Sequence, residues 1–421
     1  MTGMDHISLD TQARAILATN DRGGYTVPTA GLYPYQWNWD SAFAAWGFAQ
    51  FDVERAWVEV ETLFSGQWDN GMVPHILFHK ADPGYFPGPD VWGCGGPVPS
   101  SGISQPPVAA TFIRALWEKD RAAGDARLAA LLPKLIAWHR WFMDWRLENG
   151  AVCITHPWES GRDNAPDWDG AMARITPMDV GDYERRDTTH VDPAMRPTKD
   201  DYDRYVWLVQ RGRKLGWDEA AMRKGSPFRV ADPTMTFILM RANRDLESMG
   251  QALGQDMTEV RQWTDTLEHG AEHLWNPEIA AYDAYDVGTQ TFSGGVSNAA
   301  FLCWYGGLDD DRMRAQVTRV WDAARYPVPS LDTQSPKFDA KRYWRGPTWA
   351  IMNAIIAVGM RDRGLLEEAA RLRADTAALI ARHGFAEYFD PITGTAAGGG
   401  TFTWTAAVWL AWASPSAEGE G

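Results

Sequence analysis

Apolar residues that recur every three or four positions constrain this chain more than any other feature of its sequence. Such stripes run through residues 53–64, 128–145 and 365–379, and the middle one consists of Leu128, Leu131, Leu135, Trp138, Phe142 and Trp145. A helical period places these side chains on one face, so each segment predicts an amphipathic helix. Asp232-Pro233 adds an N-cap followed by proline at N1, which predicts a helix that reaches about Ser248.

Helical patterns extend over most of the chain and predict about a dozen helices. The other expected helices lie near residues 8–19, 39–50, 108–122, 201–213, 256–274, 296–305, 309–324, 347–361 and 402–413. Pro133 is expected to start or kink the helix over 128–145. Strand signals are few, and the best covers residues 151–155. This pattern fits an all-α toroid of six helical hairpins, with apolar inner helices and amphipathic outer ones.

The long segments between the helices are rich in Gly, Pro and aromatic residues. They cover residues 20–38, 66–107, 155–198, 276–294, 325–347 and 384–401. Irregular segments of this length are usually functional or disordered, and their aromatic content argues against disorder. No low-complexity linker divides residues 1–415, so we expect a single domain whose long loops build a pocket at one rim. Residues 416–421 are expected to form a disordered tail.

Composition narrows the function classes. The formal net charge is -15 and no Lys/Arg run occurs, which argues against a nucleic-acid partner. Three widely spaced cysteines suit a reducing compartment, and neither a signal peptide nor a membrane span is visible, so we expect a cytoplasmic protein. The 23 tryptophans suit either a large aromatic core or a concave sugar site lined by flat rings.

Residues 155–169 gather acidic side chains between two tryptophans. The four carboxylates are Glu159, Asp163, Asp167 and Asp169, and the rings are Trp158 and Trp168. Desolvation and like charge both raise the pKa of a carboxyl group, which is how a site keeps one acid protonated at neutral pH. Our hypothesis is that Asp163 is a general acid. A solvated acidic loop or a calcium-type loop would explain the same residues.

Other loops carry polar residues among aromatic ones. Asp40 suits either a helix cap or an acceptor for sugar hydroxyls, with Gln36 and Trp37 beside it. His75 and His79 are four residues apart, but Pro74 disfavours a helix there and no third ligand is evident, so no metal site is expected. These histidines suit contacts with a polar or anionic part of a substrate.

Two arginines and one glutamate are further candidates. Arg196 and Arg204 suit recognition of a carboxylate, since guanidinium binds it bidentately, although a structural ion pair would explain each equally well. Residues 341–349 suit a stacking and hydrogen-bonding wall. Glu387 lies among aromatic residues and suits either a buried ion pair with an arginine or a general base that activates water.

As a set, these motifs resemble those of glycoside hydrolase family 63, and within it the bacterial glucosylglycerate and mannosylglycerate hydrolases. The resemblance rests on segments 37–43, 158–164, 343–349, 387–390 and 402–405, which occur in the family's order. It implies an (α/α)6 toroid with a small cap built from insertions near 66–107 and 155–198. It also implies inverting hydrolysis of an α-glycosidic bond, without a cofactor or a metal.

The resemblance implies roles for individual residues. The family's acid falls on Asp163 and its base on Glu387. The residues expected to bind the substrate are Tyr33, Gln36, Trp37, Asp40, His75, Tyr85, Gln105, Arg162, Arg196, Arg204, Tyr343, Trp344 and Trp349. An arginine of the 196–204 region would meet the carboxylate of the glycerate, although the sequence does not select which one.

Other functions fit the same sequence. A trehalase-type hydrolase of neutral α-glucosides is one, but the trehalase glycine run precedes the base, whereas Gly398–Gly400 follow Glu387. A non-catalytic sugar-binding toroid and a phosphorylase are the others. The expected partner is a small glycoside, with a homo-oligomer left open. The sequence does not choose between glucose and mannose, and it does not identify a host pathway.

Overall fold

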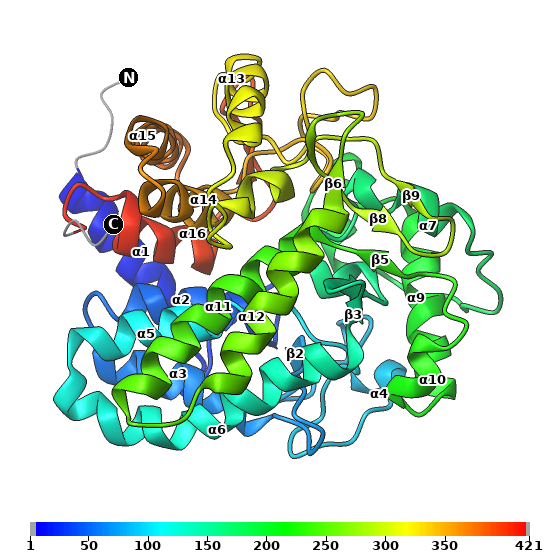
Figure 1. The fold of residues 1–421 in the computed structure, drawn as a ribbon, viewed down its shortest axis with the longest axis horizontal. Helices are drawn as coiled ribbons and strands as arrows, with labels where there is room; N and C mark the ends of the chain where they lie inside the picture. Colours follow the sequence, from blue (N-terminus) through cyan, green and yellow to red (C-terminus); the bar gives the residue numbers. More distant parts are fainter. Residues whose placement is uncertain (1–5, 418–421) are drawn as a thin grey trace.

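The computed structural model describes residues 6–417, and helices dominate it (Figure 1). Within these residues, six helical elements close an inner ring in which each contacts the next. They are α2 (Asn38–Phe48), α5 (Ala109–Lys119), α11 (Pro233–Ala252), the 3₁₀ helix η5 (Asn298–Cys303), α14 (Ala350–Asp362) and α16 (Thr403–Val408). The ring confirms the predicted all-α toroid.

An outer layer of helices covers this ring. Its members are α1 (His6–Asn20), α3 (Val53–Ser65), α6 (Arg121–Trp145), α12 (Thr258–Ala271), α13 (Arg314–Asp322) and α15 (Leu366–His383). Burial follows the predicted division between the layers. All of α14 from Ala350 to Met360 is buried except Val358, whereas α15 buries one stripe of residues and exposes the rest. The inner helices are therefore apolar nearly all round and the outer ones are amphipathic.

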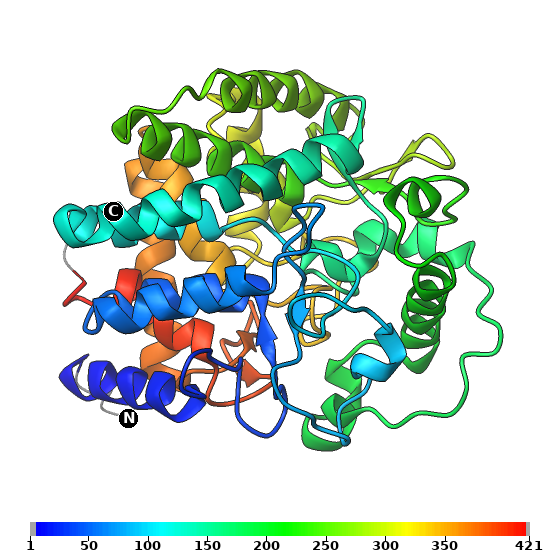
Figure 2. The ribbon, with the colours of Figure 1, turned by 90° about the horizontal axis from the view of Figure 1, so that it is seen from below.

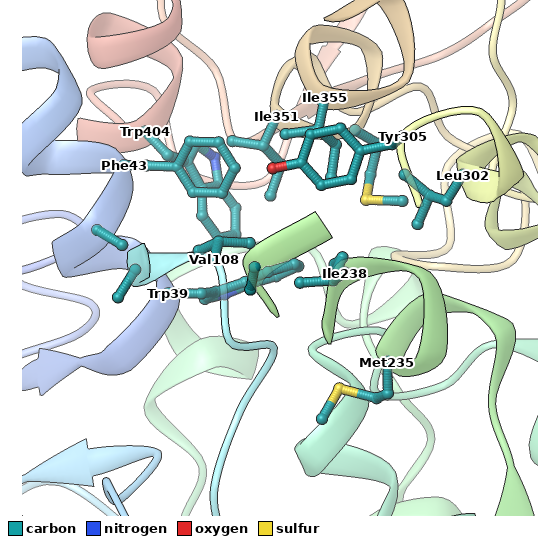
Figure 3. Packing of buried hydrophobic residues seen from close by; sticks show 14 of the residues in the cluster. Trp39, Phe43, Val108, Met235, Ile238, Leu302, Tyr305, Ile351, Ile355 and Trp404 are labelled. Atoms are coloured by element: carbon teal, nitrogen blue, oxygen red, sulfur yellow. The ribbon is translucent and has the colours of Figure 1, made fainter. Parts of the chain in front are cut away.

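The core lies inside the ring, where side chains of the inner elements meet (Figure 3). The labelled members are Trp39, Phe43, Val108, Met235, Ile238, Leu302, Tyr305, Ile351, Ile355 and Trp404. Every inner element contributes to the buried cluster, so packing at the centre couples helices that lie far apart in the sequence. Much of the tryptophan content belongs to this core.

The ring closes where the two ends of the chain meet, and α1 and α16 lie side by side in both ribbon views (Figures 1 and 2). Asp10 on α1 accepts hydrogen bonds from Trp409 Nε1 at 2.7 Å and Ser414 Oγ at 2.8 Å. Asn20 at the end of α1 donates to Thr403 Oγ1 at 2.9 Å. The last inner helix thus takes the first helix of the chain as its outer partner.

Most predicted helix boundaries hold within a few residues, and three local predictions can be compared directly. Asp232 caps α11 by accepting from Thr234 N–H, with Pro233 at N1, as predicted. Pro133 does not start a helix, because α6 begins at Arg121 under an Asp120 cap and runs through the proline. The segment expected to be helical over 296–305 forms a short 3₁₀ helix over 298–303.

A small antiparallel sheet was not predicted from the sequence. Its strands run in the order β3 (Leu147–Glu148), β4 (Ala151–Ile154), β5 (Val230–Ala231), β8 (Tyr285–Asp286) and β9 (Thr291–Phe292). Apart from β4, each strand is two residues long, too short to leave an alternating pattern. The sheet lies with α7 (Asp169–Ala173) and α9 (Lys199–Lys214) on the side of the molecule away from α1 (Figure 1).

The remaining short elements lie in the connecting segments. The strand pairs are β1 (Gln36–Trp37) with β2 (Ile76–Leu77), β6 (Trp275–Asn276) with β7 (Ala281–Tyr282), and β10 (Tyr388–Phe389) with β11 (Ala396–Ala397). The short helices are α4 (Pro89–Trp92), η1 (Pro157–Ser160), η2 (Pro166–Trp168), α8 (Arg186–His190), η3 (Pro193–Met195), α10 (Glu219–Arg223), η4 (Glu272–Leu274), η6 (Asp311–Met313) and the π-helical turn η7 (Trp409–Ala413).

Two predictions about the whole chain can be compared with the described residues only. Of the predicted disordered tail, Ser416 and Ala417 are described, and Ala417 N–H donates to Ser414 O at 3.0 Å in a turn. Residues 418–421 of that tail lie outside the described part. Across residues 6–417, no helix combines the length and apolar content needed to cross a membrane.

The contact between the chain ends gives a stability prediction. Asp10→Ala removes a carboxylate that accepts two hydrogen bonds, so the free energy of unfolding should fall by about 1–3 kcal/mol. Denaturant unfolding of the two proteins measures this change. Thr11→Ala, on the same helix, removes a hydroxyl that bonds only within the helix, and it should change stability by less than about 0.5 kcal/mol. Equal effects of the two variants would contradict closure through Asp10.

Candidate active site

A cavity of about 820 Å³, including its open mouth, lies among the long connecting segments. Its walls come from residues 28–40, 75–105, 158–163, 186–202 and 387–404, together with Tyr343. A cavity of this size holds one small ligand. Of the residues predicted to form the site, it brings together Tyr33, Trp37, Asp40, His75, Tyr85, Gln105, Asp163, Arg196, Tyr343 and Glu387.

A tight turn after η1 carries Asp163 to the cavity wall. Gly161 has φ of +70°, and a Cβ there would lie 2.6 Å from the ring of Trp39, so glycine alone allows this close approach. The Trp168 indole donates to Arg162 O at 2.8 Å, and the Tyr205 hydroxyl donates to Asp163 O at 2.9 Å. The backbone on both sides of the Asp163 Cα is therefore fixed.

The acidic residues around Asp163 are engaged elsewhere. Glu159 is bound to Arg146 at 2.9 Å, Asp167 to Arg162, and Asp169 to Arg345 at 2.8 Å. Among the residues that the structure describes, Asp163 is the carboxylate of this segment without an ion pair, and its partly exposed side chain lines the cavity. The segment is neither a solvated acidic loop nor a set of converging ligands.

Electrostatics keep Asp163 protonated near neutral pH. Burial raises the pKa of its carboxyl from 3.8 to about 7; the positive charge of Arg196 opposes this, and the negative charges of Glu387 and Asp187 add to it. Desolvation is the main cause, because the charged form loses its water. A carboxyl group with this pKa can donate a proton at physiological pH.

Glu387 reaches the same cavity from a different part of the chain. It precedes β10, and its backbone N–H donates to Gly399 O at 2.8 Å. Gly398 has φ of +72°, and a Cβ there would lie 2.2 Å from Glu387 Oε2. Contact thus explains Gly398, because the backbone of the turn passes directly against the carboxylate there.

The carboxylate of Glu387 accepts hydrogen bonds from three donors. Arg196 Nη1 donates to Oε2 at 3.1 Å, Gly399 N–H donates to Oε2 at 3.2 Å, and the Tyr33 hydroxyl donates to Oε1 at 3.3 Å. Burial raises the pKa of Glu387, and Arg196 and the other donors lower it. The buried ion pair with an arginine, one of the two sequence interpretations, is present, and the same carboxylate also lines the cavity.

Arg196 is held between two carboxylates. Its Nε donates to Asp187 Oδ2 at 3.1 Å, its Nη2 donates to the Tyr33 hydroxyl, and its guanidinium lies 4.0 Å from the centre of the Tyr343 ring. Opposite charges on two sides and an aromatic face allow a guanidinium that is only 3% exposed to keep its charge. Arg196 therefore carries a fixed positive charge beside Glu387.

Other polar residues of the wall are also buried. Asp40 lies in the first turn of α2 and is not its N-cap, which is Trp37. Burial raises the pKa of Asp40 well above 3.8. Gln105 Oε1 accepts from Trp39 N–H at 3.2 Å, and the ring of His75 bonds Ser101 Oγ at 3.0 Å through Nδ1. Burial lowers the pKa of His75 well below 6.5, so this histidine is neutral.

Five residues predicted to contact the substrate do not line the cavity. Gln36 is buried against Ser41, Glu59 and His79. Arg204 lies on α9 beside Asp200, where it also donates to Ile175 O. Trp344 and Trp349 are fully buried and stack on each other at 3.8 Å, and Arg162 is fully buried behind the turn of Asp163. Their aromatic or basic character reflects packing and ion pairing.

Several residues that were not predicted from the sequence also line the cavity. Arg186 and Asp187 at the start of α8 line it, as do Phe86, Phe402 and Trp404. Arg186 is bound to Asp82 Oδ1 at 2.6 Å, which joins the segments 66–107 and 155–198 across the cavity. The available signal was the charged run from Asp182 to Asp187, which resembles an ordinary solvated loop.

A helical toroid whose aromatic cavity holds two buried carboxyl groups is the arrangement of a glycoside hydrolase. The chain belongs to the family described as the mannosylglycerate hydrolase MGH1-like glycoside hydrolase domain, whose model matches residues 33–405. This membership confirms the resemblance stated from the sequence motifs.

Individual relatives extend over nearly the whole chain. Mannosylglycerate hydrolase MGH1 of Selaginella moellendorffii is 46% identical over 410 residues, which are 95% of this chain and 84% of the relative. A glucosylglycerate hydrolase of Mycolicibacterium hassiacum is 34% identical over 96% of this chain and 97% of its own. The crystal structure of the GH63 mannosylglycerate hydrolase of Thermus thermophilus with Tris and D-glycerate has a TM-score of 0.93 at 46% identity, covering 96% of this chain and 99% of that one.

The raised pKa of Asp163 gives a prediction about stability. In the unfolded chain this carboxyl ionises near 3.8, and in the folded protein near 7, so ionisation favours unfolding progressively between about pH 4 and 7. Asp163→Asn removes this effect. At pH 8 the variant should therefore be more stable than the parent protein and unfold at a higher temperature. The difference in the free energy of unfolding should be on the order of 1–4 kcal/mol at pH 8 and should shrink toward pH 4. Calorimetry across this pH range measures it, and a variant less stable at pH 8 would contradict the burial of an unpaired acid.

Proposed function

We propose that this chain is an inverting α-glycosidase that hydrolyses mannosylglycerate, and less readily glucosylglycerate, to the free hexose and glycerate. The single observation that carries the mechanism is the pairing of two differently held carboxyl groups at one cavity. Asp163 has no ion pair and a pKa of about 7, whereas Glu387 accepts three hydrogen bonds, one from a cation. The relatives named above support the substrate class, and mannose is preferred because the relatives at 46% identity are mannosylglycerate hydrolases.

In the proposed reaction, protonated Asp163 donates its proton to the glycosidic oxygen as the bond to the anomeric carbon breaks. Ionised Glu387 takes a proton from a water molecule as that water attacks the anomeric carbon from the opposite face. The products are a hexose of inverted configuration and glycerate, and the two carboxyl groups exchange charge states during one turnover. Inverting enzymes separate the two carboxyl groups by roughly 6.5–9.5 Å to leave room for the water.

The fixed charge of Arg196 serves the base in this scheme. A base must be ionised before the water arrives, and burial alone would protonate Glu387. Arg196 and Gly399 N–H stabilise the carboxylate through Oε2, which leaves Oε1, beside the Tyr33 hydroxyl, to accept from water. Tyr33 therefore stands next to the expected position of the attacking water.

We assign the glycerate carboxylate to Arg186. Arg204 does not line the cavity, and all three guanidinium nitrogens of Arg196 already have partners: Glu387, Asp187 and Tyr33. Arg186 lines the cavity, is partly exposed, and uses only its two terminal nitrogens, with Asp82. The ion pair with Asp82 uses two of the five N–H donors of this guanidinium, so Arg186 can bind an anion through the others and through its charge.

The segments 66–107 and 155–198 are proposed to act as the cap of a single catalytic domain. They supply His75, Tyr85, Arg186 and Arg196 to the wall, and the Arg186–Asp82 ion pair joins them. A cap of this kind excludes bulk water and admits the one molecule that reacts. We further propose a cytoplasmic enzyme, because its three described cysteines are free and its charge of -15 suits no nucleic acid or anionic surface.

The acid–base pair gives the central test. Asp163→Asn and Glu387→Gln should each lower kcat by about 10²–10⁴-fold, because each removes one proton transfer while preserving the shape of the side chain. Activity of the parent enzyme should fall as pH rises through about 7, where Asp163 loses its proton. NMR of the first product formed should show the β anomer from an α-linked substrate. Retention of the α anomer, or near-normal turnover in either variant, would contradict the scheme.

The assignment of Arg186 is tested with substrates that differ only in the carboxylate. Arg186→Met should raise KM for mannosylglycerate about 10-fold or more with little change in kcat, because it removes a binding contact. Mannosylglycerol, which lacks the charge, should be a poor substrate for both proteins and should lose little further. Trehalose extends the panel to neutral α-glucosides. Equal losses on mannosylglycerate and mannosylglycerol would mean that Arg186 does not recognise the anion.

A further inference from the structure

A buried polar cluster lies directly behind the turn that carries Asp163. Its centre is Arg162, whose side chain is completely buried. Arg162 Nη2 donates to Asp167 Oδ2 and lies 3.5 Å from Asp232 Oδ1, and Nη1 donates to Ser297 Oγ at 3.3 Å and Asn298 Oδ1 at 3.5 Å. The guanidinium thus points away from the cavity that the neighbouring side chain lines.

The cluster connects the turn to the inner ring. Asp232 is the N-cap of α11, and Ser297 and Asn298 lie at the start of η5. Ser297 Oγ also donates to Asp167 Oδ2 at 3.1 Å. Through one guanidinium, the turn of Asp163 is held to two inner elements of the toroid. A rigid scaffold of this kind places a reacting group more accurately than a loop can.

The cluster holds one cation and two carboxylates, so it carries no excess positive charge. Arg162 is one residue from Asp163, and an uncompensated cation there would favour the ionised acid. Asp167 and Asp232 neutralise it, and burial raises the pKa of Asp232 to about 6. Burial and the negative charge of Asp167 also raise the pKa of Asp283, to about 6.

The backbone transmits this placement to Asp163. Arg162 N–H donates to Ser160 Oγ at 2.9 Å, and Arg162 O accepts from the Trp168 indole at 2.8 Å. The next carbonyl, that of Asp163, accepts from Tyr205 at 2.9 Å. These bonds and the anchored guanidinium of Arg162 together hold the backbone of Asp163 in place.

We propose that Arg162 is a positioning residue for the general acid: it fixes the place of Asp163, while Asp167 and Asp232 offset its own positive charge. The proposal rests on the acid role of Asp163 in the proposed function. It differs from a substrate contact, because a side chain with no exposed surface cannot touch a ligand in the cavity. Misplacement of a catalytic group by about 1 Å costs on the order of 10²-fold in rate.

The test compares Arg162→Met and Arg162→Lys with Arg174→Met. Arg174 forms an ion pair with Asp286 and is a partly exposed arginine of the same segment, so its replacement controls for the loss of an ion pair. Arg162→Met should lower kcat by about 10–100-fold with KM within about 3-fold, and Arg174→Met should change neither. Arg162→Lys keeps the positive charge but lacks the planar set of guanidinium donors. Its kcat should therefore lie between those of the parent enzyme and Arg162→Met.

The pH profile separates positioning from general structural damage. Asp163 is faced by Arg196, Glu387, Asp187 and Asp40, none of which changes in these variants. Arg162→Met leaves Asp167 and Asp232 without their cation, so the alkaline limb of kcat should move to higher pH. Adding Asp167→Asn removes one negative charge, so the cluster regains the net charge that it has in the parent enzyme. The alkaline limb should then move back toward that of the parent enzyme.

The outcomes distinguish this proposal from the proposed function. A raised KM with unchanged kcat, or an unchanged kcat and pH profile, would overturn the positioning role. If the parent enzyme hydrolyses no glycosylglycerate, the proposed function is wrong. Crystal structures then still test whether Arg162 fixes the position of the Asp163 carboxyl. Displacement of the Asp163 carboxyl in Arg162→Met, or in Arg162→Lys where the Met variant does not fold, supports the proposal. If residues 160–165 occupy the same positions in the parent and variant structures, the proposal is wrong.

Discussion

The burial of two carboxyl groups at one cavity is the constraint on which the rest of this structure depends. Burial raises the pKa of each group, and the negative charge of Glu387 raises that of Asp163 further, so the two would behave alike unless their surroundings differed. They differ through Arg196, which binds one oxygen of Glu387 and forms no ion pair with Asp163. Asp187 and the Tyr343 ring in turn keep that guanidinium charged inside the protein. In the proposed scheme, this cation and the two other donors to Glu387 distinguish the base from the acid.

Such a site requires a rigid frame, because unpaired buried charge favours unfolding. The toroid supplies this frame through a closed ring, in which every inner element has two neighbours and the last is joined to the first. Glu387, late in the chain, is held by Tyr33 near its beginning and by Arg196 from its middle, so the site forms only when these segments meet. Closure through Asp10 and Asn20 therefore contributes to the site as well as to stability.

The sequence revealed the helices, since their apolar stripes are long. It also supplied the proposed acid and base, Asp163 as one of four carboxylates between tryptophans and Glu387 as a lone acid among aromatic residues, and the structure brings both to one cavity. It did not reveal the sheet, whose strands are mostly two residues long. Nor could it separate Trp37, which lines the cavity, from Trp344 and Trp349, which stack inside the core. These rings occupy similar motifs, and only packing between distant segments decides which face a ligand can reach. Among the arginines, Arg196 lines the cavity as predicted, whereas Arg162 and Arg204 do not.

Two of those arginines together explain why the acid and the base occupy their respective positions. Arg196 directs its charge at Glu387, whereas Arg162, next to Asp163 in the sequence, directs its charge away from the cavity and into Asp167 and Asp232. Both guanidinium groups are nearly or fully buried, so the sign of their effect depends entirely on orientation. In the proposed scheme, the orientation of these two buried arginines therefore favours proton donation by Asp163 and proton acceptance by Glu387.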